Sequence, residues 1–224
     1  MLKNSQTTYH QLESNPISVA TNHEVDKIWT FIDCNIFGFI PYYRSVRDSN
    51  KENRISEFLI YYFHCCMSEQ MEGFPPYLFS KNPTQSQSER ETDIGVCAII
   101  FNEKPITLIE FEAKCLSENS NNKEYVYGKR GGIERFKRGF HASHLSVCGM
   151  FGYVQSNNTE HWINRINGWI RELSDSNADT TIRWSKKEIL MKVDLPSKVE
   201  KYSSSHQRLS LNDTIFLWHY FIEL

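Results

Sequence analysis

Several features that would point directly to a function class are missing from this sequence. No apolar run in its 224 residues approaches the length of a membrane span, and its polar start lacks the apolar core of a signal peptide. We therefore expect a cytoplasmic protein without a membrane partner. The six cysteines show no Cys-x-x-Cys pairing, which favours reduced, packed thiols over zinc sites or disulfides.

An excess of basic charge is also missing. The formal net charge of −2 and the pI near 6.5 provide no general attraction to nucleic acid, so an anionic partner has to be bound through a local patch. The sequence shows no helix-turn-helix reader and no internal repeat. With 40% hydrophobic residues, the chain is expected to be globular and long enough to bury a substantial core.

What is present is an alternation of helical and β-type patterns, which predicts an α/β domain with a mixed sheet. Two β-type runs separated by a four-residue turn form a predicted hairpin. Residues 1–21 read as a polar arm and residues 201–209 as a polar linker. Helical patterns cover 23–32, 54–63, 160–173 and the later part of 128–138, and β-type runs cover 94–101, 106–115, 146–155, 188–193 and 214–222.

One strand carries an unusual set of charges. Because side chains alternate faces along a strand, Glu110, Glu112 and Lys114 are expected on one face, with Ile109 and Phe111 on the other. Two carboxylates and an ammonium on a half-buried strand need neutralisation, either by pairing with one another or by a hard divalent cation. The alternative is a surface ladder in which Lys114 pairs with a carboxylate on an exposed face.

The predicted hairpin adds a further carboxylate to this face. Asp93 stands just before the first hairpin strand, so the hairpin can bring it close to Glu112. Glu57, on the preceding helix, is a fourth candidate, although its position suits a solvated helix face equally well. Metal-assisted phosphodiester hydrolysis needs such carboxylates together with a cation that stabilises charge at phosphorus.

The set of Glu57, Asp93 and the Glu112-Ala113-Lys114 tripeptide resembles the active site of the PD-(D/E)XK nuclease superfamily. The resemblance implies a restriction-endonuclease-like α/β fold, with a mixed central β-sheet flanked by α-helices. It further implies one domain over 1–224, with a catalytic core at 53–155 and a helix and strands at 156–224 that complete the fold.

The resemblance also implies roles for individual residues. Asp93 and Glu112 would hold Mg²⁺, with Mn²⁺ as a possible substitute, and Lys114 would contact the scissile phosphate or the attacking water. Glu57 would be a further catalytic or metal-binding carboxylate. Glu110 would be either an extra acidic group at the metal or a surface residue.

A glycine-rich basic segment follows the hairpin. Its side chains could track a phosphate backbone, with the glycines at a helix start close to a phosphate, or they could be the solvated face of an ordinary helix. Arg135 is the best single candidate. The nucleic-acid-binding candidates are Lys129, Arg130, Arg135, Lys137 and Arg138.

The sequence leaves the roles of several histidines open. His141 and His144 have a helical spacing that could serve zinc, but the sequence offers no clearly spaced third ligand, which favours a structural or substrate role. His206 and Arg208 are either a polar patch near the substrate or part of a linker.

Together these patterns predict a Mg²⁺-dependent endonuclease acting on double-stranded DNA, of the kind found in restriction or phage defence. It would act as a homodimer or with a partner subunit of a defence system. Two alternatives stay open: an inert nuclease-fold subunit for DNA binding or assembly, and a nuclease directed at RNA, since the same site chemistry permits both nucleic acids.

Overall fold

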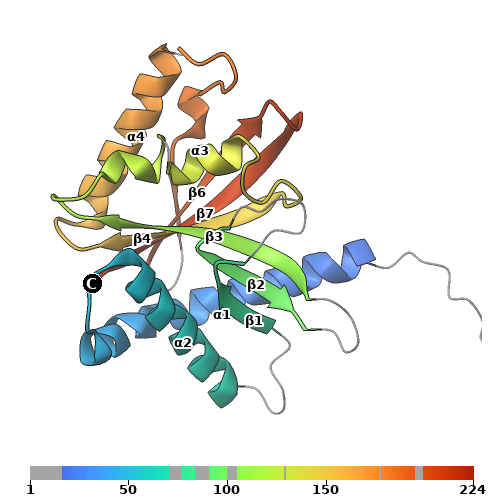
Figure 1. Ribbon diagram of the computed structural model, residues 1–224, viewed down its shortest axis with the longest axis vertical. Helices are drawn as coiled ribbons and strands as arrows, with labels where there is room; N and C mark the ends of the chain where they lie inside the picture. The colour runs from blue at the N-terminus through green and yellow to red at the C-terminus, as the bar shows by residue number, and fades with distance from the viewer. Residues whose placement is uncertain are drawn as a thin grey trace, which may run out of the picture.

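A mixed β-sheet forms the centre of the molecule (Figure 1). The computed structural model describes residues 17–70, 77–83, 91–99, 105–128, 130–176, 178–194 and 199–224. Within these residues the sheet has seven strands in the order β1-β2-β3-β4-β7-β6-β5. The strands are β1 (Tyr77–Lys81), β2 (Ile94–Ala98), β3 (Ile106–Leu116), β4 (Val147–Val154), β5 (Met191–Val193), β6 (Glu200–Arg208) and β7 (Asp213–Glu223).

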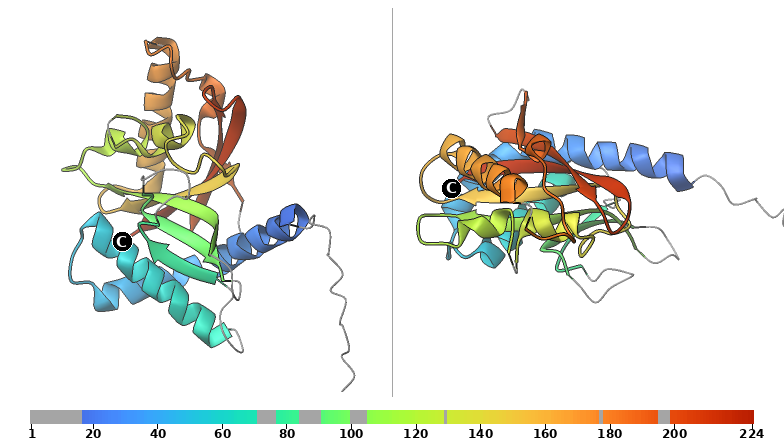
Figure 2. Two further views of the ribbon diagram at one scale, coloured as in Figure 1. Left: turned by 45° about the vertical axis from the view of Figure 1, so that its right-hand side comes forward. Right: turned by 90° about the horizontal axis from the view of Figure 1, so that it is seen from above.

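Helices cover both faces of this sheet. In Figures 1 and 2, α1 and α2 lie on one side of it and α3 and α4 on the other. The predicted α/β class with a mixed sheet is therefore confirmed. Among the described residues, no helix is long and apolar enough to cross a membrane. The helices are α1 (Ile17–Val46), α2 (Glu52–Gln70), α3 (Gly132–Lys137) and α4 (Thr159–Ser176), with short 3-10 helices η1 (Asn122–Tyr125) and η2 (Lys186–Glu188).

The alternation of side chains along the strands builds a separate apolar core on each face. On β4, Phe151 and Tyr153 pack with α1 and α2, whereas Cys148 and Met150 pack with α3 and α4. The Phe111 ring of β3 lies directly against Gly149 of β4 and leaves no space for a side chain there. The close approach of these two neighbouring strands thus depends on that glycine.

The first strands of the sheet place the charged face of β3. β1, β2 and β3 form an antiparallel meander, and β4 and β7 then continue parallel to β3. The predicted hairpin is confirmed as β2 and β3, although its residues 100–104 lie outside the described part. The sequence analysis missed β1, a five-residue strand that pairs along the whole of β2.

Two predictions about irregular segments are wrong. The first helix begins at Ile17, so residues 17–21 of the expected arm are helical, while residues 1–16 lie outside the described part. The expected linker at 201–209 is almost entirely strand β6. Its alternate residues, among them Ser204 and His206, are buried but polar, so the strand lacks the apolar alternation by which a half-buried strand is recognised.

Candidate functional site

The β2–β3 hairpin brings three of the predicted site residues together. The Asp93 backbone N–H donates to the carbonyl oxygen of Phe111, and its carboxylate Oδ2 accepts from the Ala113 N–H at 2.7 Å. The Lys114 Nζ lies 3.2 Å from Glu112 Oε2 and 3.6 Å from Asp93 Oδ2. Asp93, Glu112 and Lys114 therefore form one cluster on the face of the sheet that carries α3.

A fourth member, Glu52, was missed by the sequence analysis. Its Oε2 accepts a hydrogen bond from the Cys115 N–H of β3 at 2.9 Å, and its Oε1 lies 3.7 Å from Lys114 Nζ. Ser49 and Glu52 have the Ser-x-x-Glu spacing of a capping box at a helix start. Ser49 Oγ instead accepts from the Lys51 N–H, and Glu52 reaches across to the sheet. Its acidic character in the first turn of a helix was the only signal pointing to it.

The structure does not bring Glu57 to this cluster. Its carboxylate pairs with Arg54 at 2.8 Å and with Lys81 at 2.6 Å, and the side chain is 39% exposed. Glu57 stands five positions after Glu52 on the same helix, which places the two side chains about 140° apart around the axis of α2. Only Glu52, at the start of the helix, reaches the Lys114 side.

Two cationic or ionisable groups support Glu112, whose side chain is fully buried. Arg135 of α3 approaches Glu112 Oε2 at 3.4 Å, and His141 Nδ1 lies 2.7 Å from Glu112 Oε1. The two atoms are in close contact but outside hydrogen-bond geometry. Burial works to raise the pKa of Glu112, but His141, Lys114 and Arg135 outweigh it and hold the pKa below its usual value. Glu112 is thus kept as a buried carboxylate anion.

At the Asp93 carboxyl, by contrast, the effects that raise the pKa outweigh those that lower it. Burial, followed by repulsion from Glu112, raises the pKa of Asp93 to about 6, although Lys114 and the Ala113 N–H counteract part of the shift. Burial alone would lower the pKa of Lys114, but the surrounding carboxylates of Glu112, Asp93 and Glu52 raise it above its usual value. Lys114 is therefore firmly an ammonium ion at neutral pH.

An open, polar cleft of about 710 Å³ gives access to this cluster. Besides Glu52, Asp93 and Lys114, it is lined by basic and amide side chains and by two further carboxylates, those of Glu91 and Glu124. Glu110 does not line it: Glu110 is buried on the same face of β3, 4.0 Å from the His144 ring. The lining residues are Lys51, Glu52, Asn53, Asn82, Glu91, Asp93, Lys114, Glu124, Arg130 and Arg135.

The basic candidates separate into different environments. Arg130 and Arg135 line the cleft, and Lys129 lies outside the described residues. The Lys137 side chain is fully buried, with its ammonium 2.6 Å from Glu188, so it cannot reach a nucleic acid in this conformation. Arg138 does not line the cleft and pairs with Glu134 and Asp179.

The remaining candidates from the sequence, His206 and Arg208, belong to a buried polar network on β6. Ser204 Oγ lies 2.7 Å from the rings of both His206 and His219, and His206 Nδ1 is 3.6 Å from Glu188. Arg208 is paired with Asp213 at the end of the same strand. None of these residues lines the cleft.

The oxygen donors around Lys114 fit a hard divalent cation in chemical type. No group of His, Cys, Asp and Glu side chains in the described ranges forms a ready metal centre. Lys114 Nζ, however, also donates to the Ala113 carbonyl oxygen at 2.8 Å, so three carboxylates and one carbonyl face a single positive charge. Carboxylate and carbonyl oxygens are the ligands that Mg²⁺ and Mn²⁺ take. The donor set therefore fits, with the ammonium standing where a cation would be held.

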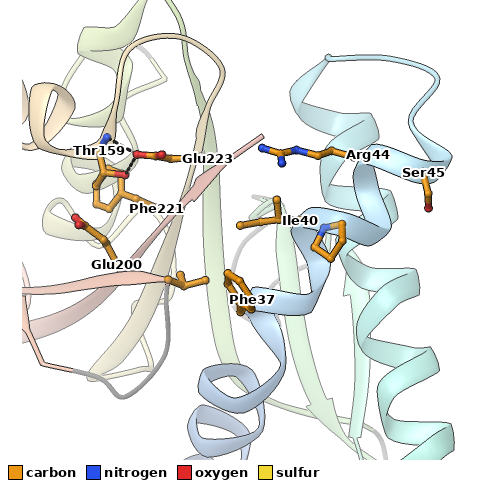
Figure 3. Close-up of a pocket in the computed structure, with 10 residues that line it drawn as sticks. Phe37, Ile40, Arg44, Ser45, Thr159, Glu200, Phe221 and Glu223 are labelled. Atoms are coloured by element: carbon orange, nitrogen blue, oxygen red, sulfur yellow. Dashed lines mark hydrogen bonds between the residues drawn. The ribbon is translucent and has the colours of Figure 1, made fainter.

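A second hollow, of about 830 Å³, lies between α1 and the ends of β6 and β7 (Figure 3). Phe37 and Ile40 form its apolar side, and Arg44 points from α1 towards the side formed by Glu223. The Glu223 carboxylate is already engaged, since it accepts from the Thr159 N–H at the start of α4. This hollow contains none of the clustered residues around Lys114.

No protein-family model matches the chain, and neither a curated protein nor a solved structure matches it.

Proposed function

We propose that this chain is a metal-dependent nuclease that hydrolyses phosphodiester bonds, acting as a DNA endonuclease in restriction or phage defence. The observation that carries the proposal is the convergence of Asp93, Glu112 and Lys114 in one open cleft. Asp93 immediately precedes β2, Glu112 lies on the adjacent strand β3, and the Lys114 ammonium contacts both carboxylates. A buried structural ion pair would not require access to a polar cleft of this size.

The order of elements supports the same proposal. Helix α2 is followed by an antiparallel meander, by the basic helix α3 and then by β4 parallel to β3. With β1 in place, Asp93 precedes the second strand and Glu112 lies on the third, which is the arrangement on which the resemblance to the PD-(D/E)XK superfamily rests. A restriction-endonuclease-like form of the α/β fold is part of this proposal.

Each side chain then has a defined task. Asp93, Glu112 and Glu52 would hold Mg²⁺, which when bound supplies a water of lowered pKa and neutralises charge on the phosphate. Arg135 and His141 keep Glu112 ionised and fix its position. Lys114 would orient the attacking water or contact the scissile phosphate, and Arg130 would hold the phosphate backbone at the rim of the cleft.

Incubation with supercoiled plasmid tests the proposal. Wild-type protein is expected to nick or linearise the plasmid with Mg²⁺ and not with EDTA, and Asp93→Asn and Lys114→Ala are expected to abolish cleavage. The control is Asp175→Asn, which removes a carboxylate from an exposed ion pair on α4 and should retain full activity. Melting temperatures of all variants separate loss of activity from loss of fold.

The outcomes discriminate among the candidate functions. Full activity in Lys114→Ala would refute the assignment of the site. Metal-dependent cleavage of RNA but not DNA would move the proposal to an RNA-directed nuclease. Wild-type protein that binds DNA without cutting either nucleic acid would favour an inert nuclease-fold subunit for binding or assembly.

A further inference from the structure

The ammonium group of Lys114 has the surroundings of a bound cation. Four oxygen atoms face it: Ala113 O at 2.8 Å, Glu112 Oε2 at 3.2 Å, Asp93 Oδ2 at 3.6 Å and Glu52 Oε1 at 3.7 Å. The side chain is only 11% exposed, although it borders an open cleft. A lysine free to contact a phosphate would extend into that cleft, whereas Lys114 turns back onto its own strand.

The oxygens are held in place by groups other than Lys114. The Ala113 N–H fixes the Asp93 carboxylate, and the Cys115 N–H fixes that of Glu52. Arg135 contacts the same Glu112 Oε2 as Lys114 does, and His141 Nδ1 lies against Glu112 Oε1. β3 and α3 therefore position these carboxylates, and Lys114 supplies their counter-charge.

Convergence of three carboxylates without a central cation would be unstable. Of the three carboxylates, Arg135 and His141 contact only Glu112 within the described part of the chain, and Lys114 is the cationic group that contacts Asp93 and Glu52 Oε1. At separations near 4 Å, like charges in a partly buried site repel by several kcal/mol, about 4 at an effective dielectric constant of 20. A cation must therefore take the central position, either the ammonium or a divalent metal.

We propose that Lys114 is the resident counter-ion of the metal-free protein, so that its ammonium and a divalent cation compete for the same oxygens. Metal binding then displaces Lys114 from the carboxylates into the cleft, where it meets the phosphate. This inference rests on the proposed function, which identifies the metal site. It adds that metal binding regulates the position of Lys114, because the bound metal frees the lysine from the carboxylates.

Calorimetric titration of Mn²⁺ and Mg²⁺ into purified protein tests the competition. Lys114→Met is expected to bind Mn²⁺ at least about tenfold more tightly than wild type, because the carboxylates stay and their competitor is gone. The matched control is Lys51→Met, which removes an ammonium from the rim of the same cleft and should change the affinity by less than about threefold. Unchanged or weaker binding in Lys114→Met would overturn the inference, as would the absence of metal binding in every variant.

A second measurement uses the wild-type chain and does not depend on how the variants fold. Buried ammonium groups that pair with carboxylates give slowly exchanging ¹H–¹⁵N NMR signals. The Lys114 signal should shift or broaden away on saturation with Mg²⁺. Lys137 and Lys201, buried against Glu188 and Asp33, supply internal controls whose signals should stay fixed. A Lys114 signal that is unchanged at saturating Mg²⁺ would refute displacement.

These outcomes are separable from those of the nuclease proposal. Tighter metal binding in Lys114→Met without plasmid cleavage by wild type would keep the counter-ion role and remove the nuclease. Cleavage by wild type with unchanged metal affinity in Lys114→Met would keep the nuclease and remove the counter-ion role.

Discussion

The Glu52 carboxylate at the start of α2 accepts a hydrogen bond from the Cys115 N–H of β3, with 2.9 Å between Oε2 and the nitrogen. This contact spans 63 residues of sequence and fixes the first turn of the helix to the strand that carries Glu112 and Lys114. It leaves Oε1 directed at the Lys114 ammonium. A carboxylate from outside the hairpin thereby joins the two that the hairpin supplies.

We predict that Glu52→Gln lowers plasmid cleavage by about tenfold to a hundredfold, since groups that support a metal site typically carry effects of this size. The glutamine oxygen can still accept from the Cys115 N–H, so the fold should be retained. Cleavage rates at saturating Mg²⁺ and the melting temperature provide the measurement.

Glu57→Gln is the matched comparison. It makes the same chemical change five residues along the same helix, in a carboxylate paired with Arg54 and Lys81. We expect its cleavage rate to stay near wild type. Equal losses in the two variants would show that the geometry around Lys114 does not select Glu52.

The sequence was sufficient for the elements whose periodicity is apolar. The hairpin, β4, β7 and α4 were all predicted, because their buried side chains are hydrophobic and recur at a spacing of two or of about 3.6 residues. The cluster of Asp93, Glu112 and Lys114 was predicted for a related reason. Asp93 immediately precedes the first strand of one hairpin and the other two lie on its second strand, so local connectivity alone brings them together.

The parts that were missed depend on contacts distant in sequence. Glu52 reaches Cys115, and His141 reaches Glu112, through tertiary packing that no spacing encodes. The sequence of strand β6 predicts a linker because polar residue types such as His206 and Ser204 suggest exposure, whereas in the structure these two side chains contact each other inside the protein. Lys137 was assigned to nucleic acid for the same reason: its buried partner, Glu188, lies 51 residues away.

Lys137 is expected to contribute to stability and not to recognition. Its ammonium donates to Glu188 and to the Gln207 carbonyl oxygen, and burial, partly offset by Glu188, lowers the pKa of the lysine. Lys137→Ala would leave Glu188 as a buried carboxylate without this partner, at a cost of about 3–5 kcal/mol in the free energy of unfolding. Urea denaturation measures this. A variant as stable as wild type would contradict the prediction.

Arg130, in contrast to Lys137, is expected to contribute to recognition of nucleic acid and not to stability. It is exposed at the rim of the cleft, so Arg130→Ala should change the free energy of unfolding by no more than about 0.5 kcal/mol. If it contacts a phosphate, its removal weakens DNA binding equally for all sequences and reduces the salt dependence of log affinity by about one unit. Fluorescence anisotropy across a range of salt concentrations tests this. An unchanged slope would place the DNA elsewhere on the surface.

Keeping the Asp93 carboxylate beside Glu112 costs stability at neutral pH. Burial, together with repulsion from Glu112, raises the pKa of Asp93 from 3.8 to about 6, against the opposing effect of Lys114 and the Ala113 N–H; Glu52 adds to the rise. Between about pH 4 and pH 6 the folded protein keeps a proton on Asp93 that the unfolded chain has lost. The free energy of unfolding therefore falls as pH rises through this window.

Asp93→Asn should remove that fall, because the amide is neutral throughout and its oxygen can still accept from the Ala113 N–H. In metal-free buffer, the variant and wild type should be about equally stable near pH 4. Above pH 6 the variant should be more stable by up to about 3 kcal/mol, an upper value because the carboxyl is 23% exposed. Urea denaturation of both proteins from pH 4 to pH 8 measures the difference, and a difference independent of pH would show that Asp93 does not carry a raised pKa.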